Sequence, residues 1–324
     1  MSESNKTTFG PVPSRRLGRS LGINNIPPKV CSYACVYCQV GRTLRMEVKR
    51  KEFYDPEIIL RDTEEKIRDA AKRQEPIDYL SFVPDGEPTL DVHLGREIKE
   101  LKKFGIKIAV ITNSSLLWRE DVRNELSEAD WVSVKVDAAT PDVWRKVNRP
   151  HGSLELDKIL RGISQFARVF KGDLATETML IHQINDHAEE IGGISDFIST
   201  IAPKKSYLSI PTRPPAESRI GPPAESVLNR AYQIFIDKGI PTECLIGYEG
   251  NAFAFTGDVN EDLLSITAVH PMRDDAVREL LSKAGAGWEV IERLIEDKKL
   301  IEVNYENRIF YIRKMVRDAQ KESV

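Results

Sequence analysis

Short apolar runs alternate with longer amphipathic segments over most of the chain. The runs are rich in Val, Ile and aromatic residues and predict β-strands at 17–24, 79–83, 107–112, 131–136, 175–181, 207–210 and 242–246. The segments between them predict helices at about 55–73, 91–104, 119–129, 154–170, 187–201 and 222–238, with a short helix beginning at Thr140. Repeated strand-then-helix units predict an α/β fold with a parallel sheet covered by helices. Any active site should lie at the carboxyl ends of the strands.

After about residue 260 the pattern changes. Helices at 274–284 and 287–298 precede strands at 300–303 and 308–313, which pair as a hairpin around Tyr305-Glu306-Asn307. This order predicts a small winged-helix-like domain, so we expect a large domain at 1–255 and a second domain at 256–324. Winged helices often contact nucleic acid. Residues 270–324, however, carry eleven basic and eleven acidic side chains, a net charge of 11 − 11 = 0, which favours packing or protein contact.

The composition is ordinary for a globular protein, with 41% hydrophobic and 30% charged residues. No uninterrupted apolar run approaches the ~20 residues that a membrane helix needs, and residues 1–6 lack the apolar region of a secretory signal. We therefore expect a cytoplasmic protein without membrane contact. Of the four cysteines, Cys31, Cys35 and Cys38 fall within eight residues, which indicates metal binding rather than a disulfide framework.

Basic residues are concentrated around these cysteines, although the whole chain has a formal net charge of −3. Between Arg15 and Lys51 the chain has nine Lys or Arg and one acid, Glu47, so the local charge is 9 − 1 = +8. Phosphate groups bind to surfaces of this kind. The stretch therefore suggests a large anionic substrate, with RNA as the first hypothesis.

The spacing of Cys31, Cys35 and Cys38 lets three thiolates wrap one compact cluster from a single loop. Iron–sulfur clusters are normally held by four cysteines, so three thiolates leave one iron without a protein ligand. An open coordination position distinguishes a reacting metal site from a structural one. Zinc fits less well, because a structural zinc site needs a fourth Cys or His, and none lies within 50 residues of Cys38.

The cysteine motif, with the aromatic Tyr37 just before its last cysteine, resembles the signature of the radical S-adenosylmethionine (SAM) superfamily. The resemblance implies a partial (βα)6 TIM-like barrel, here followed by the winged-helix-like domain. It also implies a [4Fe–4S] cluster whose open iron binds SAM. One electron, from a donor such as ferredoxin or flavodoxin, would cleave SAM to methionine and a 5′-deoxyadenosyl radical that abstracts a hydrogen atom from the substrate.

Further motifs support the same resemblance. The strand at 79–83 is followed by Gly86-Glu87-Pro88, which resembles the superfamily's Gly-Gly-Glu-Pro motif for binding the SAM amino group. Asp85 stands where the first glycine is usual. The resemblance also implies cofactor contacts from side chains at other strand ends and in the cysteine loop, namely Tyr37, Asn113, Ser133 and Asn185.

Three residues are candidates for catalysis. Alternation along the strand at 131–136 places Ser133, Lys135 and Asp137 on one face. A polar face inside a parallel barrel costs free energy unless it lines a site, although a buried Lys–Asp pair with a structural role is the alternative. Cys244 is a candidate radical-accepting thiol, or else a small buried hydrophobic residue.

A closer resemblance is to the wyosine-synthase-like branch of the superfamily. It covers roughly residues 9–250 and rests on Gly10-Pro11-Val12-Pro13-Ser14-Arg15-Arg16-Leu17-Gly18, Tyr37-Cys38-Gln39, and Val136-Asp137-Ala138-Ala139-Thr140-Pro141 followed by Asn148-Arg149-Pro150. Members that build the wyosine base on tRNA carry a second cluster on extra N-terminal cysteines. This chain has no cysteine before Cys31, so the resemblance does not extend to that reaction.

Three hypotheses about function remain. The first is a radical SAM enzyme that acts on RNA. The second keeps the same chemistry but places it on a protein or peptide that docks on the C-terminal domain. The third is a non-enzymatic iron–sulfur regulator that binds DNA through the winged helix, although the neutral charge of this domain argues against it.

Overall fold

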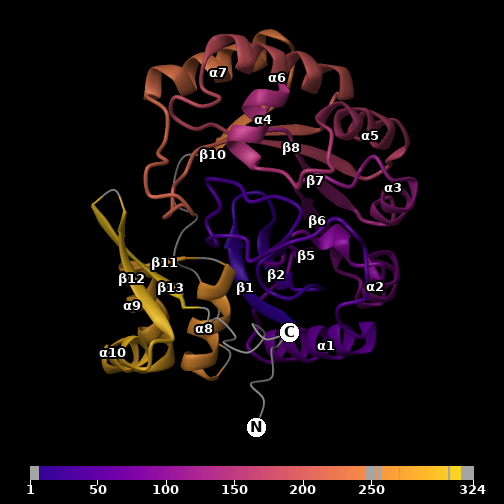
Figure 1. Cartoon of the computed structure of the whole chain (residues 1–324). Helices are drawn as coiled ribbons and strands as arrows, with labels where there is room; N and C mark the ends of the chain where they lie inside the picture. Colours follow the sequence, from indigo (N-terminus) through magenta and orange to yellow (C-terminus); the bar gives the residue numbers. More distant parts are fainter. Residues whose placement is uncertain are drawn as a thin grey trace, which may run out of the picture.

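The structure is a computed structural model that describes residues 7–245, 253, 255, 257–269, 271–305 and 307–314 (Figure 1). Its main element is an eight-stranded sheet in the order β1-β2-β5-β6-β7-β8-β9-β10. Neighbouring strands from β2 to β10 are parallel, whereas β1 pairs with β2 antiparallel. The strands are β1 (Thr8–Ser14), β2 (Gly18–Ile23), β5 (Tyr79–Phe82), β6 (Lys107–Thr112), β7 (Trp131–Lys135), β8 (Asp173–Met179), β9 (Lys205–Ser209) and β10 (Thr242–Leu245).

Helices cover the outer face of this sheet, which curls into an open half-barrel (Figure 1). The chain passes through at least one helix between each parallel strand and the next, as the sequence predicts, and this confirms the partial (βα)6 barrel. The helices are α1 (Pro56–Lys72), α2 (Leu94–Leu101), α3 (Glu120–Leu126), α4 (Pro141–Asn148), α5 (Leu156–Val169), α6 (Ala188–Ile201) and α7 (Glu225–Asp237), with the short 3-10 helices η1 (Pro88–Leu90) and η2 (Lys102–Phe104).

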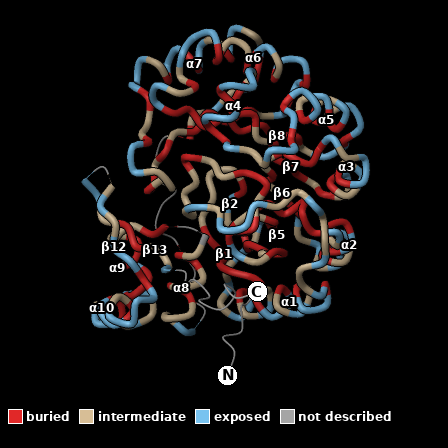
Figure 2. Tube along the Cα trace, viewed as in Figure 1, coloured by how far each residue is buried: buried red, intermediate tan, exposed pale blue. Residues whose placement is uncertain are grey.

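The two faces of the sheet are filled by different side chains. On the outer face, Val132 and Val134 of β7 pack with the helices in the main apolar core. On the inner face, Ala109, Trp131 and Ala175 form a second, smaller cluster. Figure 2 shows the strands as largely buried and the outer sides of the helices as exposed. Lys135 and Glu177 follow this cluster on the same face of β7 and β8, so the barrel interior can hold a polar site.

The sequence prediction missed β1, which carries Gly10, Pro11 and Pro13. Proline cannot donate a ladder hydrogen bond and is therefore confined to edge strands or bulges. The strand lies at the edge of the sheet and its pairing with β2 shifts register between Phe9 and Val12. Phe9 and Val12 belong to the apolar cluster of the C-terminal segment. The missed strand is thus the element on which that segment packs.

The C-terminal segment has its own three-stranded sheet in the order β11-β13-β12. The predicted helix at 274–284 is present, whereas α8 and β11 were not predicted. The winged-helix interpretation and the proposed domain boundary at 255/256 stay predictions. Residues 246–252, 254 and 256, next to that boundary, lie outside the described residues. So do Ile246 of the predicted strand at 242–246 and Glu306 of the predicted turn. The elements are α8 (Val259–Val269), β11 (Met272–Arg273), α9 (Asp274–Ala284), α10 (Glu289–Glu296), β12 (Leu300–Tyr305) and β13 (Arg308–Arg313).

The described helices differ in length and in amphipathic character. None of them combines the length and the apolar character required to cross a membrane.

Two short strands outside the main sheet, β3 (Val30–Cys31) and β4 (Arg45–Met46), pair with each other next to the carboxyl ends of the barrel strands.

Candidate active site

The loop that carries the three cysteines is fixed to the turn after β5 by its backbone. Val30 forms a parallel bridge with Gly86, and the N–H of Glu87 donates to the carbonyl of Val30 at 3.2 Å. A Cβ atom on Gly86 would lie 2.0 Å from that carbonyl oxygen, so this position accepts only glycine without a shift of the backbone. The glycine of the Gly86-Glu87-Pro88 motif therefore allows the cysteine loop to approach.

The thiols of Cys31, Cys35 and Cys38 are free and partly buried. Asn113 Nδ2 lies 3.4 Å from Cys31 Sγ, and Asn148 Nδ2 lies 3.4 Å from Cys35 Sγ. Both amides therefore point N–H groups at sulfur, as the protein groups around iron-bound thiolates do.

Burial raises the pKa of all three thiols, that of Cys35 to about 12. Negative charge on Cys35 and Cys38 raises the pKa of Cys31 further, because the sulfur atoms are neighbours. Bound cations would replace the protons and remove this penalty.

The three thiols lie on one loop and form a sulfur donor set. Among the residues that the structure describes, no group of three His, Cys, Asp or Glu side chains is arranged to hold a single metal ion. The donor set, three sulfurs with amide N–H groups on two of them, fits a [4Fe–4S] cluster.

Glu87 is buried and its carboxylate holds the ends of two strands together. Its oxygens accept hydrogen bonds from the Thr112 hydroxyl at 2.6 Å, from the Asn113 N–H at 2.7 Å and from the Thr89 N–H at 3.1 Å. Burial raises the pKa of Glu87, while these bonds act to lower it. The side chain thus positions Asn113 beside Cys31.

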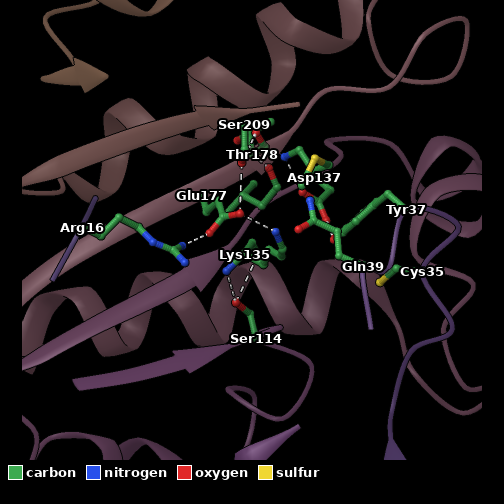
Figure 3. A network of polar contacts seen from close by, with 12 residues as sticks. Arg16, Cys35, Tyr37, Gln39, Ser114, Lys135, Asp137, Glu177, Thr178 and Ser209 are labelled. Atoms are coloured by element: carbon green, nitrogen blue, oxygen red, sulfur yellow. Dashed lines mark hydrogen bonds and ion pairs between the residues drawn. The ribbon is translucent and has the colours of Figure 1, made fainter. Parts of the chain in front are cut away.

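A second polar group surrounds Asp137, just beyond the end of β7. The Tyr37 hydroxyl donates to one oxygen of Asp137, and Asn148 Nδ2 donates to the same oxygen at 2.8 Å. The other oxygen accepts the N–H of Met179 at 2.8 Å. Figure 3 shows Tyr37 and Cys35 on the same side of this group. Asp137 therefore fixes the cysteine loop to β7 and β8.

Lys135 and Glu177 form an ion pair inside the barrel, with 2.9 Å between Nζ and Oε1 (Figure 3). Arg16, from the turn between β1 and β2, pairs with the other oxygen of Glu177. Burial alone would raise the pKa of Glu177, but Arg16 and Lys135 hold it well below its usual range. Burial alone would lower the pKa of Lys135, yet Glu177 and Asp137 raise it. Lys135 therefore stays charged in the interior.

The remaining predicted residues lie in different places. Ser133 is buried on β7, on the inner face with Lys135. Asn185 is also buried, and its amide is used by the backbone: Oδ1 accepts from Ile181, and Nδ2 donates to the carbonyls of Asp137 and Met179, each at 2.8 Å. It supports the turn after β8 and offers no spare donor to a ligand.

Cys244 does not join the site. It lies on β10 and packs against the helix-covered core, whereas its neighbour Leu245 belongs to the inner cluster. The side-chain alternation of a strand therefore turns the thiol away from the barrel interior. Burial raises the pKa of this thiol, which suits a packing role rather than a reactive one.

Lys29 and Asp85 form an ion pair that sequence reasoning missed. Lys29 Nζ lies 2.8 Å from Asp85 Oδ2, and both side chains are almost fully buried. Burial raises the pKa of Asp85 to about 6, although Lys29 acts against this rise. The ion pair with Lys29 explains how this chain tolerates an acid where the superfamily usually has glycine. In the sequence, only the departure of Asp85 from the motif could have indicated this ion pair.

Part of the basic stretch around the cysteines is neutralised by acids distant in the sequence. Arg16 pairs with Glu177, Lys29 with Asp85, and Arg50 with Glu125. Exposed cations of this stretch are Arg42, Arg45 and Lys49. The local charge of +8 therefore does not form one continuous cationic face, and it supports an RNA substrate less than the sequence suggests.

The chain matches one family model and a relative of nearly the same length. The family model described as the radical SAM superfamily matches residues 25–192. A UPF0026 protein of Methanocaldococcus jannaschii is 49% identical over 307 residues, which cover 94% of this chain and 95% of that protein.

Solved structures are similar at the level of the fold. A radical SAM methyltransferase from Sphaerobacter thermophilus matches with a TM-score of 0.54 and 14% identity, over 70% of this chain and 66% of that one. A structure of the wyosine synthase TYW1 with a lysine–pyruvate adduct bound matches with a TM-score of 0.43 and 14% identity, over 91% and 80% of the two chains.

Proposed function

We propose, because this chain belongs to the radical SAM superfamily, that Cys31, Cys35 and Cys38 hold a [4Fe–4S] cluster beside a binding site for SAM and a substrate. Members of the superfamily use such a cluster, SAM and a reductant. The cluster and SAM together supply a carbon-centred radical that abstracts a hydrogen atom. The observation that carries the proposal is the set of three free thiols on one loop, with Asn113 and Asn148 directed at two of the sulfurs.

The chain's own residues would bind and orient the cofactor. We assign the SAM contacts to the Gly86-Glu87-Pro88 turn, Asn113, Ser133 and Tyr37. The turn and Asn113 follow two neighbouring strands, β5 and β6, and Asn113 already touches Cys31. Asp137 and Asn148 would keep Tyr37 and Cys35 in register. Asn185, whose amide is fully used by the backbone, would act only by positioning Asp137.

Lys135 and Arg16 would bind an anionic group of the substrate. Both pair with Glu177. An incoming carboxylate or phosphate would therefore meet two cations held in place inside the barrel, where little water weakens the attraction. A lysine whose pKa is raised remains protonated at neutral pH. We therefore assign Lys135 the role of a cation. RNA, the first hypothesis, would supply phosphates, and a peptide would supply carboxylates.

One contact favours the second substrate class, a protein or peptide. The Tyr305 hydroxyl, on the β12–β13 hairpin, donates to the carbonyl of Pro211 at 3.2 Å, just after β9. The C-terminal segment (residues 256–324 in the proposed domain division) therefore reaches the chain that leaves the carboxyl end of a barrel strand. The DNA-regulator alternative is disfavoured, because α10 exposes Glu289, Glu292 and Glu296, and these repel phosphates.

The proposed location is the cytoplasm. A low-potential cluster and four free cysteines need reducing conditions. Ferredoxin or flavodoxin is the proposed class of electron donor, since both carry single electrons at low potential.

The test is anaerobic reconstitution with iron and sulfide, followed by dithionite and SAM. We expect a cluster absorption band and 5′-deoxyadenosine from the wild-type chain, and neither from Cys35→Ser. Cys244→Ser is the matched control, because it makes the same change at a thiol outside the site, and it should behave as wild type. Total RNA and a protein digest, each from cells grown in deuterated medium, are then added separately, and the class that transfers deuterium into 5′-deoxyadenosine contains the substrate. Absence of the band in wild type contradicts the proposal.

A further inference from the structure

The segment that follows the cysteine loop folds back over it. We call residues 42–49 the ledge. Its strand β4 pairs with β3, so that Met46 lies opposite Cys31. The N–H of Glu47 donates to the carbonyl of Cys31 at 3.0 Å, and the Thr43 hydroxyl donates to the carbonyl of Tyr33 at 2.7 Å. The backbone of the ledge is therefore one hydrogen bond away from a proposed cluster ligand.

The outer surface of the ledge combines apolar and cationic side chains. Leu44 is 60% exposed and Met46 is 38% exposed. Among the large hydrophobic residues that the structure describes, Leu44 has the highest exposed fraction. Arg42 and Arg45 lie beside them with 77% and 63% of their side chains exposed, and their carboxylate partners are at 3.9 and 3.8 Å. Ion pairs this long and exposed hold the arginines weakly.

We propose that the ledge is the docking surface for an acidic electron-carrier protein, an inference that rests on the proposed function. An apolar centre with a charged rim is the anatomy of a protein interface. Arginines at the rim steer an oppositely charged partner and speed its encounter. Electron-transfer complexes are small and short-lived, so a surface of a few side chains is sufficient.

Two features favour a carrier protein over RNA at this surface. RNA bases stack on aromatic rings, whereas the ledge presents the aliphatic side chains of Leu44 and Met46. The ledge is also bonded to the backbone of Cys31, and electron transfer slows steeply with distance. One electron would pass from the reduced carrier, which is oxidised by one electron, to the cluster, which is reduced by one, with no bond made or broken.

The test uses the double variant Leu44→Glu/Arg45→Glu and a purified acidic flavodoxin. Binding of oxidised flavodoxin at low salt is measured by calorimetry, which needs no cluster. Reduction of the reconstituted protein by reduced flavodoxin is followed by stopped flow. We expect the variant to lose about tenfold or more in both affinity and rate. Reduction by dithionite, which needs no docking, should be unchanged.

The matched control is Ile301→Glu/Lys299→Glu, which changes an exposed aliphatic residue and a weakly paired lysine on the C-terminal segment. It should bind and accept electrons as wild type does. Wild-type affinity for flavodoxin in the ledge variant overturns the docking proposal. A ledge variant that loses affinity for RNA rather than for flavodoxin also overturns it. Failure of the proposed function is seen separately, as absence of the cluster band in the wild-type chain.

Discussion

The barrel interior and the C-terminal segment are both attached to the β1–β2 hairpin, but by opposite kinds of contact. The turn of the hairpin sends Arg16 into the barrel, where it pairs with Glu177 and, through it, with Lys135. Phe9 and Val12 of β1 are buried in the apolar cluster of the C-terminal segment. In Figure 1 the hairpin lies between these two parts of the molecule.

The difference teaches which contacts orient and which stabilise. Buried ion pairs recover little more than the cost of removing charges from water, but breaking one leaves a bare charge. Apolar burial stabilises without directing any atom, by about 25 cal/mol per Å². We therefore infer that the charged interior sets the geometry for chemistry. The apolar contact of Phe9 and Val12 with the C-terminal segment, which we call the seam, keeps the hairpin in place.

The largest expected effect comes from Glu177→Gln. The change leaves Arg16 and Lys135 buried without their shared carboxylate, which should destabilise the protein by about 3–5 kcal/mol. Urea unfolding followed by circular dichroism measures it. Glu243→Gln on β10 is the control, because Glu243 pairs with Lys205 at 3.6 Å on the exposed surface, and a change below about 0.5 kcal/mol is expected there. Equal stability of the two variants would show that the interior charges do not depend on each other.

Phe9→Ala should have a smaller effect, of about 3 kcal/mol, because it removes a buried ring from the seam. Cluster absorption of the folded fraction should survive, since no contact of the cysteine loop is lost. Val169→Ala, at an exposed position, controls for the loss of a side chain alone. A Phe9→Ala protein that folds normally but binds no cluster would contradict the division between seam and site.

The smallest effect is expected from Glu97→Gln on α2, and it depends on pH. Burial, with a further contribution from Asp91, raises the pKa of Glu97 to about 9. The folded state therefore holds a proton that the unfolded state releases above about pH 4.5, so the wild type loses stability as the pH rises from 5 to 9.

Gln imitates the protonated acid and does not titrate. The variant should match wild type near pH 4.5 and exceed it by about 2 kcal/mol at pH 6, because each pH unit in this range costs the wild type about 1.4 kcal/mol. Urea unfolding at each pH measures the difference. Glu100→Gln, on the same helix and pairing with Arg96 at the surface, should show no such trend. A gain that does not change with pH would mean that Glu97 is ionised in the folded protein.

Local patterns predicted the elements whose signals are local. The strand at 107–112 and the helix at 274–284 match their predicted bounds, because hydrophobic alternation and helical periodicity are properties of short windows. The edge strand β1 escaped because its prolines contradict the usual strand composition. The cysteine spacing likewise needs only eight residues.

Long-range pairings were beyond the same reasoning. Arg16 and Glu177 are 161 residues apart. The sequence around either residue does not indicate that the other is its partner. The basic stretch misled for the same reason: the acids that neutralise Arg16, Lys29 and Arg50 come from other βα units. Alternation placed Lys135 correctly on the inner face. It could not show that Cys244 faces the helices, because both faces of the predicted strand at 242–246 carry apolar residues.

The contact between Gly86 and Val30 also limits how this catalyst could be rebuilt. A cysteine loop grafted alone onto another barrel would meet a side chain where this chain has none, at 2.0 Å from a backbone oxygen. The loop and the turn after β5 are therefore one transplantable unit, and an engineer who moves the thiols must carry the glycine with them.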